Sequence, residues 1–139
     1  MAANILIVDD SATMRRMIKR TLGMCGLDIA EVHEASNGIE ALARMDEHAI
    51  HAVLLDINMP VMGGVKLVER IHDDPRLKEV PIIIASTEGS ETRIAQLMEA
   101  GARAYIRKPF HPEQLRDILA PILGTRPETA VSSDDKFSF

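Results

Sequence analysis

Short apolar runs alternate along the chain with segments in which apolar residues recur at helical spacing. A short, nearly continuous apolar run indicates a strand buried on both faces, whereas recurrence at i, i+3, i+4 and i+7 indicates an amphipathic helix. The predicted strands cover residues 4–8, 29–35, 53–55, 82–85 and 104–107. Strands that alternate with helices are typical of a parallel sheet that helices cover on both faces.

The segments between these strands carry the signals of helix starts and stops. The first predicted helix runs from Ala12 to about Met24, and Gly26 supplies its stop. Ser90 is expected to cap the fourth helix, which runs to Ala100. We expect the inward helix faces to include Ile39 and four methionines that fill the core, Met14, Met17, Met24 and Met45.

These elements predict one α/β domain over residues 1–124. Its architecture is a doubly wound, five-stranded parallel sheet in the flavodoxin-like order 2-1-3-4-5, with helices on both faces. Residues 125–139 mix Pro, Ser, Thr and Asp with almost no periodicity, which predicts a disordered C-terminal tail. A docking peptide at Phe137-Ser138-Phe139 stays open as an alternative, because two aromatic side chains on an acidic tail can fill pockets of a partner.

Composition narrows the class of function. The net charge of -5 argues against a nucleic-acid surface, and the single Cys25 excludes an intramolecular disulfide. No apolar stretch approaches the ~20 residues that span a bilayer, and the start of the chain has no features of a signal peptide. We therefore expect a soluble cytoplasmic protein with no membrane partner, and a monomer.

Acidic residues follow two of the predicted strands. Asp9 and Asp10 directly follow the apolar run Ile5–Val8, and Asp56 directly follows the apolar run at 53–55. In the order 2-1-3-4-5, strands one and three are neighbours, so their carboxyl ends bring the three carboxylates together. Such a cluster suits Mg²⁺, which takes oxygen ligands and retains several waters. For Asp9 and Asp10 alone, capping of the following helix is an equally ordinary role.

A hydroxyl and an ammonium follow the last two strands. Ser86 comes directly after the fourth predicted strand and Lys108 directly after the fifth, so both side chains can face the same crevice. Each is common in an ordinary role, since serine often starts a turn and lysine usually lies in solvent. Together they complement the charge of a phosphoryl group.

Three blocks of the sequence resemble the receiver domain of two-component response regulators, in the order and spacing of that family. They are ILIVDDS at 5–11, DINMPVMGG at 56–64 and AGARAYIRKPF at 100–110. The resemblance extends from Asn4 to about Leu123. It implies that Asp56 is the phosphoacceptor. It also implies a Mg²⁺ site with Asp10, Asp56 and the Asn58 carbonyl as direct ligands, and Asp9 as a ligand through water.

The resemblance also assigns roles around the phosphoacceptor. Ser86 and Lys108 contact the phosphoryl group, and Tyr105 is the switch aromatic that responds to Ser86. Asn58 and Glu88 occupy positions that tune dephosphorylation in chemotaxis regulators. The Lys108-Pro109 bond is expected to be cis.

The implied function is that of a single-domain response regulator, and chemotaxis is one candidate pathway. A sensor histidine kinase or histidine phosphotransfer protein phosphorylates it, and it then binds a protein target. We expect the target on the face of the fourth helix, fifth strand and fifth helix, around Ile94, Met98 and Tyr105. The resemblance also implies that the protein is not a metabolic enzyme and catalyses only its own phosphorylation and dephosphorylation.

Other functions remain as alternatives. The chain could be a phosphoryl shuttle or sink in a phosphorelay, or a docking module that is independent of phosphorylation. A haloacid-dehalogenase-like phosphatase is a further alternative, but that family has a second acidic residue at the position that Asn58 occupies in this chain. A flavodoxin-type site wants a glycine-rich or hydroxyl-rich loop where Asp9 and Asp10 stand. The five histidines are scattered over different elements, and we predict no transition-metal site among them.

Overall fold

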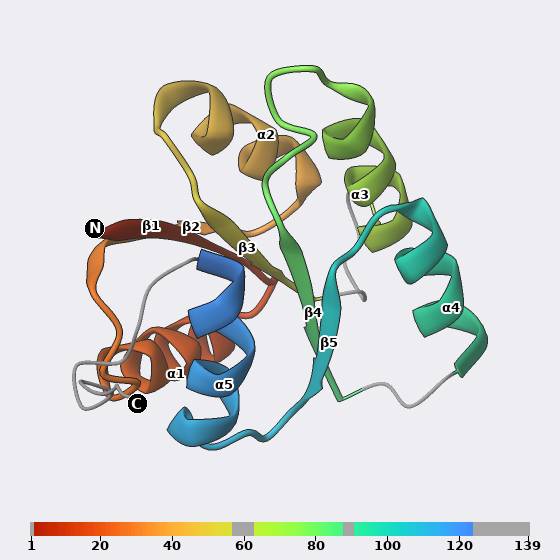
Figure 1. Ribbon diagram of the computed structural model, residues 1–139. Coiled ribbons are helices and arrows are strands. Elements are labelled where there is room, and N and C mark those ends of the chain that lie inside the picture. The colour runs from red at the N-terminus through yellow and green to blue at the C-terminus, as the bar shows by residue number, and fades with distance from the viewer. Residues whose placement is uncertain (1, 57–62, 88–90, 124–139) are drawn as a thin grey trace, which may run out of the picture.

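The computed structural model describes residues 2–56, 63–87 and 91–123, and over these residues strands alternate strictly with helices (Figure 1). The strands are β1 (Ala3–Val8), β2 (Ile29–Ala35), β3 (Ala52–Leu55), β4 (Ile82–Ser86) and β5 (Ala104–Arg107). The helices are α1 (Ala12–Gly23), α2 (Gly38–Glu47), α3 (Gly64–Asp73), α4 (Glu91–Ala100) and α5 (Pro112–Leu123). None of the helices in this part of the chain is long and apolar enough to cross a bilayer.

The strands form one parallel sheet in the order β2-β1-β3-β4-β5, which confirms the predicted topology. Val8 at the end of β1 pairs with Leu55 at the end of β3, and the Asp56 amide donates a hydrogen bond to the Val8 carbonyl at 2.9 Å. The carboxyl ends of β1 and β3 are therefore level. Any side chains that follow these strands start from neighbouring points on one edge of the sheet.

Helices cover both faces of the sheet, α1 and α5 on one side and α2, α3 and α4 on the other (Figure 1). In β1, Ile5 and Ile7 pack into the core with α1 and α5, whereas Leu6 and Val8 pack into the core on the opposite face. All four side chains are fully buried. Successive side chains of a strand point to opposite faces, so an unbroken apolar run is what a strand between two helical layers requires.

The predicted core is wrong at several helix positions. Met17 is 53% exposed, Met24 is 59% exposed and Ile39 is 58% exposed, whereas Met45 is buried as predicted. In α1 the inward positions belong to Ile18 and Leu22. A helix turns by about 100° per residue, so the neighbouring Met17 falls outside the buried stripe even though its spacing fits the pattern.

Element ends differ slightly from the predicted ones. α1 ends at Gly23, and the amide of its C-cap Met24 donates to the Thr21 and Leu22 carbonyls. Gly26 follows with a φ of 79°, in the left-handed region that glycine adopts readily. β4 continues through Ser86. The predicted Ser90 cap and the predicted tail at 125–139 lie outside the described residues.

Candidate functional site

Three carboxylates meet at the carboxyl edge of the sheet. Asp9 and Asp10 follow β1, Asp56 follows β3, and one oxygen from each lies within 4.8 Å of the other two. Asp9 is buried, Asp56 is half-buried and Asp10 is exposed. The level ends of β1 and β3 bring these residues together, as the strand order predicts.

Both carboxylate oxygens of Asp9 already have donors within the protein. The Ser11 amide donates to Oδ1 at 2.9 Å, and the Lys108 ammonium donates to Oδ2 at 2.8 Å. The cap of α1 is Ser11, whose hydroxyl accepts a hydrogen bond from the Met14 amide at 3.2 Å. Helix capping is therefore not the role of Asp9 or Asp10.

Lys108 enters the site from the end of β5. Its side chain is only 7% exposed, and its Nζ lies 3.8 Å from Asp56 Oδ1, farther than from Asp9. The Lys108 amide donates to the Ser86 carbonyl at 3.0 Å, which ties the end of β5 to the end of β4. The Lys108-Pro109 bond is cis, as the family resemblance implies.

Ser86 and Tyr105 lie together beside this edge of the sheet. Ser86 is fully buried as the last residue of β4, next to the strand that carries Asp56. Tyr105 is half-buried in β5, and its hydroxyl donates to the Ser86 carbonyl at 3.5 Å, the long end of hydrogen-bond range. The backbone carbonyl of Ser86 thus contacts both the Tyr105 side chain and the Lys108 amide.

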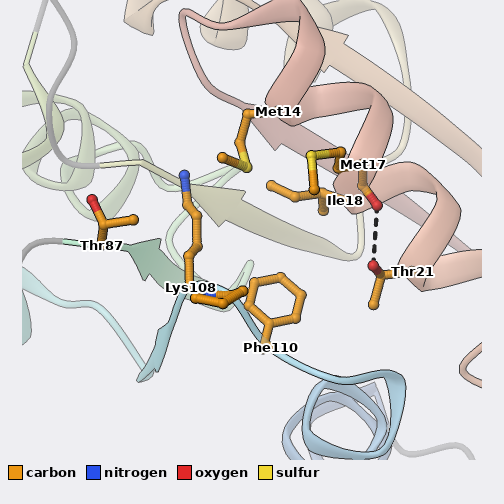
Figure 2. Close-up of a pocket in the computed structure, with 8 residues that line it drawn as sticks. Met14, Met17, Ile18, Thr21, Thr87, Lys108 and Phe110 are labelled. Atoms are coloured by element: carbon orange, nitrogen blue, oxygen red, sulfur yellow. Dashed lines mark hydrogen bonds between the residues drawn. The ribbon is translucent and has the colours of Figure 1, made fainter.

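A small apolar cavity of about 150 Å³ flanks the carbon chain of Lys108. Figure 2 shows this carbon chain beside Phe110, with the ammonium directed away from the ring. The cavity lies between α1 and the start of the segment after β5, and its lining is Met14, Met17, Ile18, Thr21, Thr87, Lys108, Pro109 and Phe110. These mostly apolar walls shield the lysine stem on this side, so the charge of Lys108 acts at the carboxylates.

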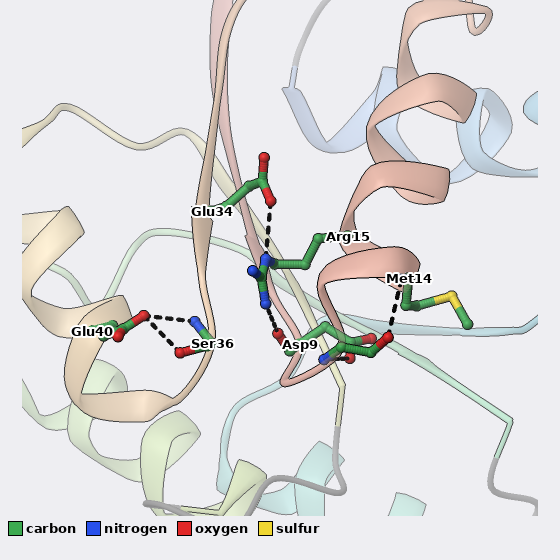
Figure 3. Close-up of polar contacts among 7 residues, drawn as sticks. Asp9, Met14, Arg15, Glu34, Ser36 and Glu40 are labelled. Carbon is green, nitrogen blue, oxygen red and sulfur yellow. Dashed lines mark hydrogen bonds and ion pairs between the residues drawn. The ribbon is translucent and has the colours of Figure 1, made fainter.

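Arg15 is a site residue that the sequence analysis missed. Its Nη1 donates to the Asp9 carbonyl at 2.7 Å, and its Nε pairs with Glu34 Oε1 at 2.9 Å (Figure 3). The guanidinium therefore links α1, β2 and the backbone of Asp9. The only sign of this role in the sequence was that Arg15 lies in the first turn of the helix after Ser11. Its partner Glu34 comes from β2, 19 residues later, so the sequence pattern did not indicate the pair.

The cluster fits a hard divalent cation. A single ammonium does not balance three carboxylates, so the ionised site has an excess of negative charge within a small volume. All ligand atoms are oxygens, which Mg²⁺ prefers. Both oxygens of Asp9 already accept hydrogen bonds from the protein. Asn58 and Glu88, two further predicted site residues, lie outside the described residues.

Comparisons with known proteins agree with this arrangement. The sequence profile of the response regulator receiver domain matches residues 5–120. The chemotaxis protein CheY1 of Helicobacter pylori is 45% identical over 122 residues, which cover 87% of this chain and 97% of CheY1.

Solved structures show the same fold. Chemotaxis protein CheY4 of Vibrio cholerae has 34% identity and a TM-score of 0.78, over 88% of this chain and 99% of CheY4. The receiver domain of the sensor histidine kinase PA1611 from Pseudomonas aeruginosa has 25% identity and a TM-score of 0.78, over 90% of this chain and 100% of that domain. That structure has a magnesium ion coordinated in its active site cleft.

Proposed function

Because the chain belongs to the response regulator receiver family, we propose that it is a chemotaxis-type response regulator that is phosphorylated on Asp56. The phosphoryl donor is a phosphohistidine on a sensor histidine kinase or a histidine phosphotransfer protein. The observation that carries this proposal is the position of Asp56. Its carboxylate is half-buried at the end of β3, beside the oxygens of two other acids and 3.8 Å from the Lys108 ammonium.

The residues of the site divide the work of phosphoryl transfer. An Asp56 oxygen attacks phosphorus, the P–N bond of the phosphohistidine breaks, and its electron pair returns to the imidazole nitrogen. Phosphoryl transfer depends mainly on positioning and on neutralising charge on the phosphoryl oxygens. Lys108 supplies a positive charge for one of these oxygens, and the Ser86 hydroxyl supplies a hydrogen bond.

We propose Mg²⁺ as the cofactor of this site. By the family resemblance, Asp10, Asp56 and the carbonyl of Asn58 would hold it directly, and Asp9 would contribute through a water. When bound, the ion neutralises charge on the phosphoryl oxygens. Asp9 has the further task of holding the Lys108 ammonium in place, which its 2.8 Å hydrogen bond supports.

The output is phosphorylation-dependent binding of a protein target. In the proposed switch, Ser86 moves toward the phosphoryl group and Tyr105 follows, because the Tyr105 hydroxyl already contacts the Ser86 carbonyl. The docking face is formed by α4, β5 and α5, where Met98 is 40% exposed and Ile94 is half-buried. Asn58 and Glu88 are the proposed tuning residues for the lifetime of the signal.

The chemotaxis assignment rests on the relatives. CheY1 of Helicobacter pylori is covered over 97% of its own length, so that protein consists almost entirely of the matched region. By analogy we place this chain in the cytoplasm, with a target protein rather than DNA as its output. A phosphoryl shuttle would have the same site. It would differ in binding no target after phosphorylation.

Intact mass measurement tests the phosphoacceptor. The wild-type chain is incubated with acetyl phosphate, with and without Mg²⁺, under conditions that preserve acyl phosphates. We expect one phosphoryl adduct that requires Mg²⁺ and is absent in Asp56→Asn. The matched control is Asp73→Asn, an exposed aspartate at the end of α3, which should form the adduct normally.

Two results would contradict the proposal. An adduct that persists in Asp56→Asn would assign the nucleophile to another residue. The absence of any adduct, with phosphohistidine donor as well as acetyl phosphate, would favour a docking module that is independent of phosphorylation.

A further inference from the structure

Two histidines that are distant in the sequence lie against each other on the opposite side of the sheet from α1. His33 comes from β2 and His48 is the C-cap of α2, and their rings stack with centroids 4.0 Å apart and planes 23° apart. Glu31, two residues before His33 on the same strand, has an oxygen 2.9 Å from His33 Nε2. One ligand atom from each of the three residues lies within 4.8 Å of the other two.

Asn4 contacts both parts of the chain that carry this cluster, namely strand β2 with Glu31 and His33, and the segment after α2 that begins at His48. In the β1–β2 ladder, Asn4 pairs with Glu31 and so fixes strand β2. The same residue holds the segment after α2, because its side-chain amide donates to the Ala49 carbonyl at 2.8 Å. The backbone amide of Asn4 also donates to His51 Nδ1 at 2.8 Å, and the backbone carbonyl of Asn4 accepts from the backbone amide of His51 at 2.8 Å. Asn4 therefore ties the strand that carries Glu31 and His33 to the segment that follows His48.

We propose that Glu31, His33 and His48 form a binding site for a divalent transition-metal ion of the Zn²⁺ class. Two imidazole nitrogens and one carboxylate oxygen are a common zinc donor set, at metal–ligand distances of about 2.0–2.2 Å. Such distances put neighbouring ligand atoms of a tetrahedral ion a little over 3 Å apart. To bind one ion with His33, the His48 ring has to turn out of the stack, because the nitrogen lone pairs of two nearly parallel rings do not converge. The exposure of His48, 40%, and of Glu31, 61%, leaves these two side chains room to rotate and close the cluster from 4.8 Å.

The geometry also gives a place for the ion. It would replace the direct contact between His33 Nε2 and Glu31 Oε1, and these two atoms, now 2.9 Å apart, would separate to a little over 3 Å to hold it. The exposed side of the cluster leaves a coordination position for water. Glu47 adds a second carboxylate nearby, with its Oε1 3.9 Å from His48 Nε2.

This site is chemically and spatially separate from the aspartate cluster. Imidazole ligands favour Zn²⁺, Ni²⁺ and Cu²⁺, whereas a site of oxygens alone favours Mg²⁺. The aspartates follow the carboxyl ends of β1 and β3, whereas His48 follows α2 and precedes the amino end of β3. An ion bound there would join the edge strand β2 to the end of α2, and we assign it a structural role.

Zinc titration of the full, untagged chain by calorimetry tests the site. We expect one Zn²⁺ per chain at this site and an upward shift of the melting temperature, because the ion binds only the folded arrangement. His33→Gln and His48→Gln should each weaken binding by about tenfold or more, the scale seen on loss of supporting groups at metal sites. The matched control is His111→Gln, an exposed histidine just before α5, which should bind as the wild type does.

Two further variants separate loss of the zinc site from misfolding and from zinc binding at the aspartate cluster. Glu31→Gln changes an exposed side chain and should also weaken zinc binding, whereas Asp10→Asn should leave this site unchanged. In wild-type protein, zinc should shift the imidazole NMR signals of His33 and His48 together. Equal affinity in all variants, or a loss of zinc binding in Asp10→Asn alone, would overturn the proposal.

Discussion

The Lys108 ammonium is hydrogen-bonded to Asp9, at 2.8 Å, across 99 residues of sequence. Its distance to Asp56 Oδ1 is 3.8 Å, so in this structure the lysine pairs with a buried neighbour of the proposed phosphoacceptor. A phosphoryl group on Asp56 would place new anionic oxygens beside the same ammonium. Asp9 thus holds the Lys108 ammonium close to the carboxylate that we propose as the phosphoacceptor.

Replacing Lys108 should affect stability and metal binding in opposite directions. We expect Lys108→Met to lower the free energy of unfolding by about 3 kcal/mol, because Asp9 is left as an unpaired buried charge. The same change should tighten Mg²⁺ binding, because the site loses its positive charge. Urea unfolding without Mg²⁺ and a Mg²⁺ titration measure the two effects.

Two comparisons identify the cause of this loss. Lys66→Met removes an exposed lysine of α3 and should change neither quantity. Asp9→Asn combined with Lys108→Met should lose less stability than Lys108→Met alone. A double variant as unstable as the single one would show that lost packing, and not the unpaired charge, is responsible.

Arg15 should matter through Asp9. We expect Arg15→Gln to cost about 1–2 kcal/mol of stability, because the Asp9 carbonyl and Glu34 both lose a charged donor. It should also slow phosphorylation by acetyl phosphate, because the backbone that carries Asp9 and Asp10 is less well held. Arg16→Gln, at an exposed position of the same helix, is the control. Equal phosphorylation rates in the two variants would remove Arg15 from the site.

The proposed switch can be followed with intrinsic fluorescence, because Tyr105 is the only tyrosine and the chain has no tryptophan. We expect beryllofluoride, a phosphoryl mimic, to change Tyr105 emission when Mg²⁺ is present. Asp56→Asn should abolish this change. Ser86→Ala should reduce it, because the variant lacks the hydroxyl that moves toward the phosphoryl group in the proposed switch. An identical response in wild type and Ser86→Ala would separate Tyr105 from Ser86.

Glu40 should contribute to stability at neutral pH and lose that contribution in acid. Hydrogen bonds from the Ser36 amide, and then from the Ser36 hydroxyl, hold the pKa of Glu40 below its ordinary value of 4.5 (Figure 3). A lowered pKa favours the ionised form in the folded chain, so the contribution disappears as pH falls below 4.5 and through the folded-state pKa.

The measurement is the free energy of unfolding between pH 7 and pH 3. Glu40→Gln should flatten the acid part of this curve relative to wild type. Glu69→Gln, at an exposed position on α3, removes the same charge outside this hydrogen-bonded turn. If both variants change the curve equally, the Ser36–Glu40 contacts are not the source of the pH dependence.

Much of the fold and the acidic cluster followed from local sequence pattern. The runs at Ile5–Val8 and Ile82–Ala85 are apolar at every position, which only a strand buried on both faces needs. The order of the strands then placed Asp9, Asp10 and Asp56 at one edge, because parallel strands end on the same side. Chain connectivity and strand burial are properties that a local pattern can encode.

Side-chain partners from different elements were decided by the tertiary structure. Helical spacing did not separate Met17, which is exposed, from Ile18, which is buried, because both fit a broad apolar stripe. The pairing of Lys108 with Asp9 and the stacking of His33 on His48 depend on how strands and helices pack at the scale of a few ångströms. Sequence thus determined which chemical groups each element carries, whereas packing between elements determined which of those groups meet.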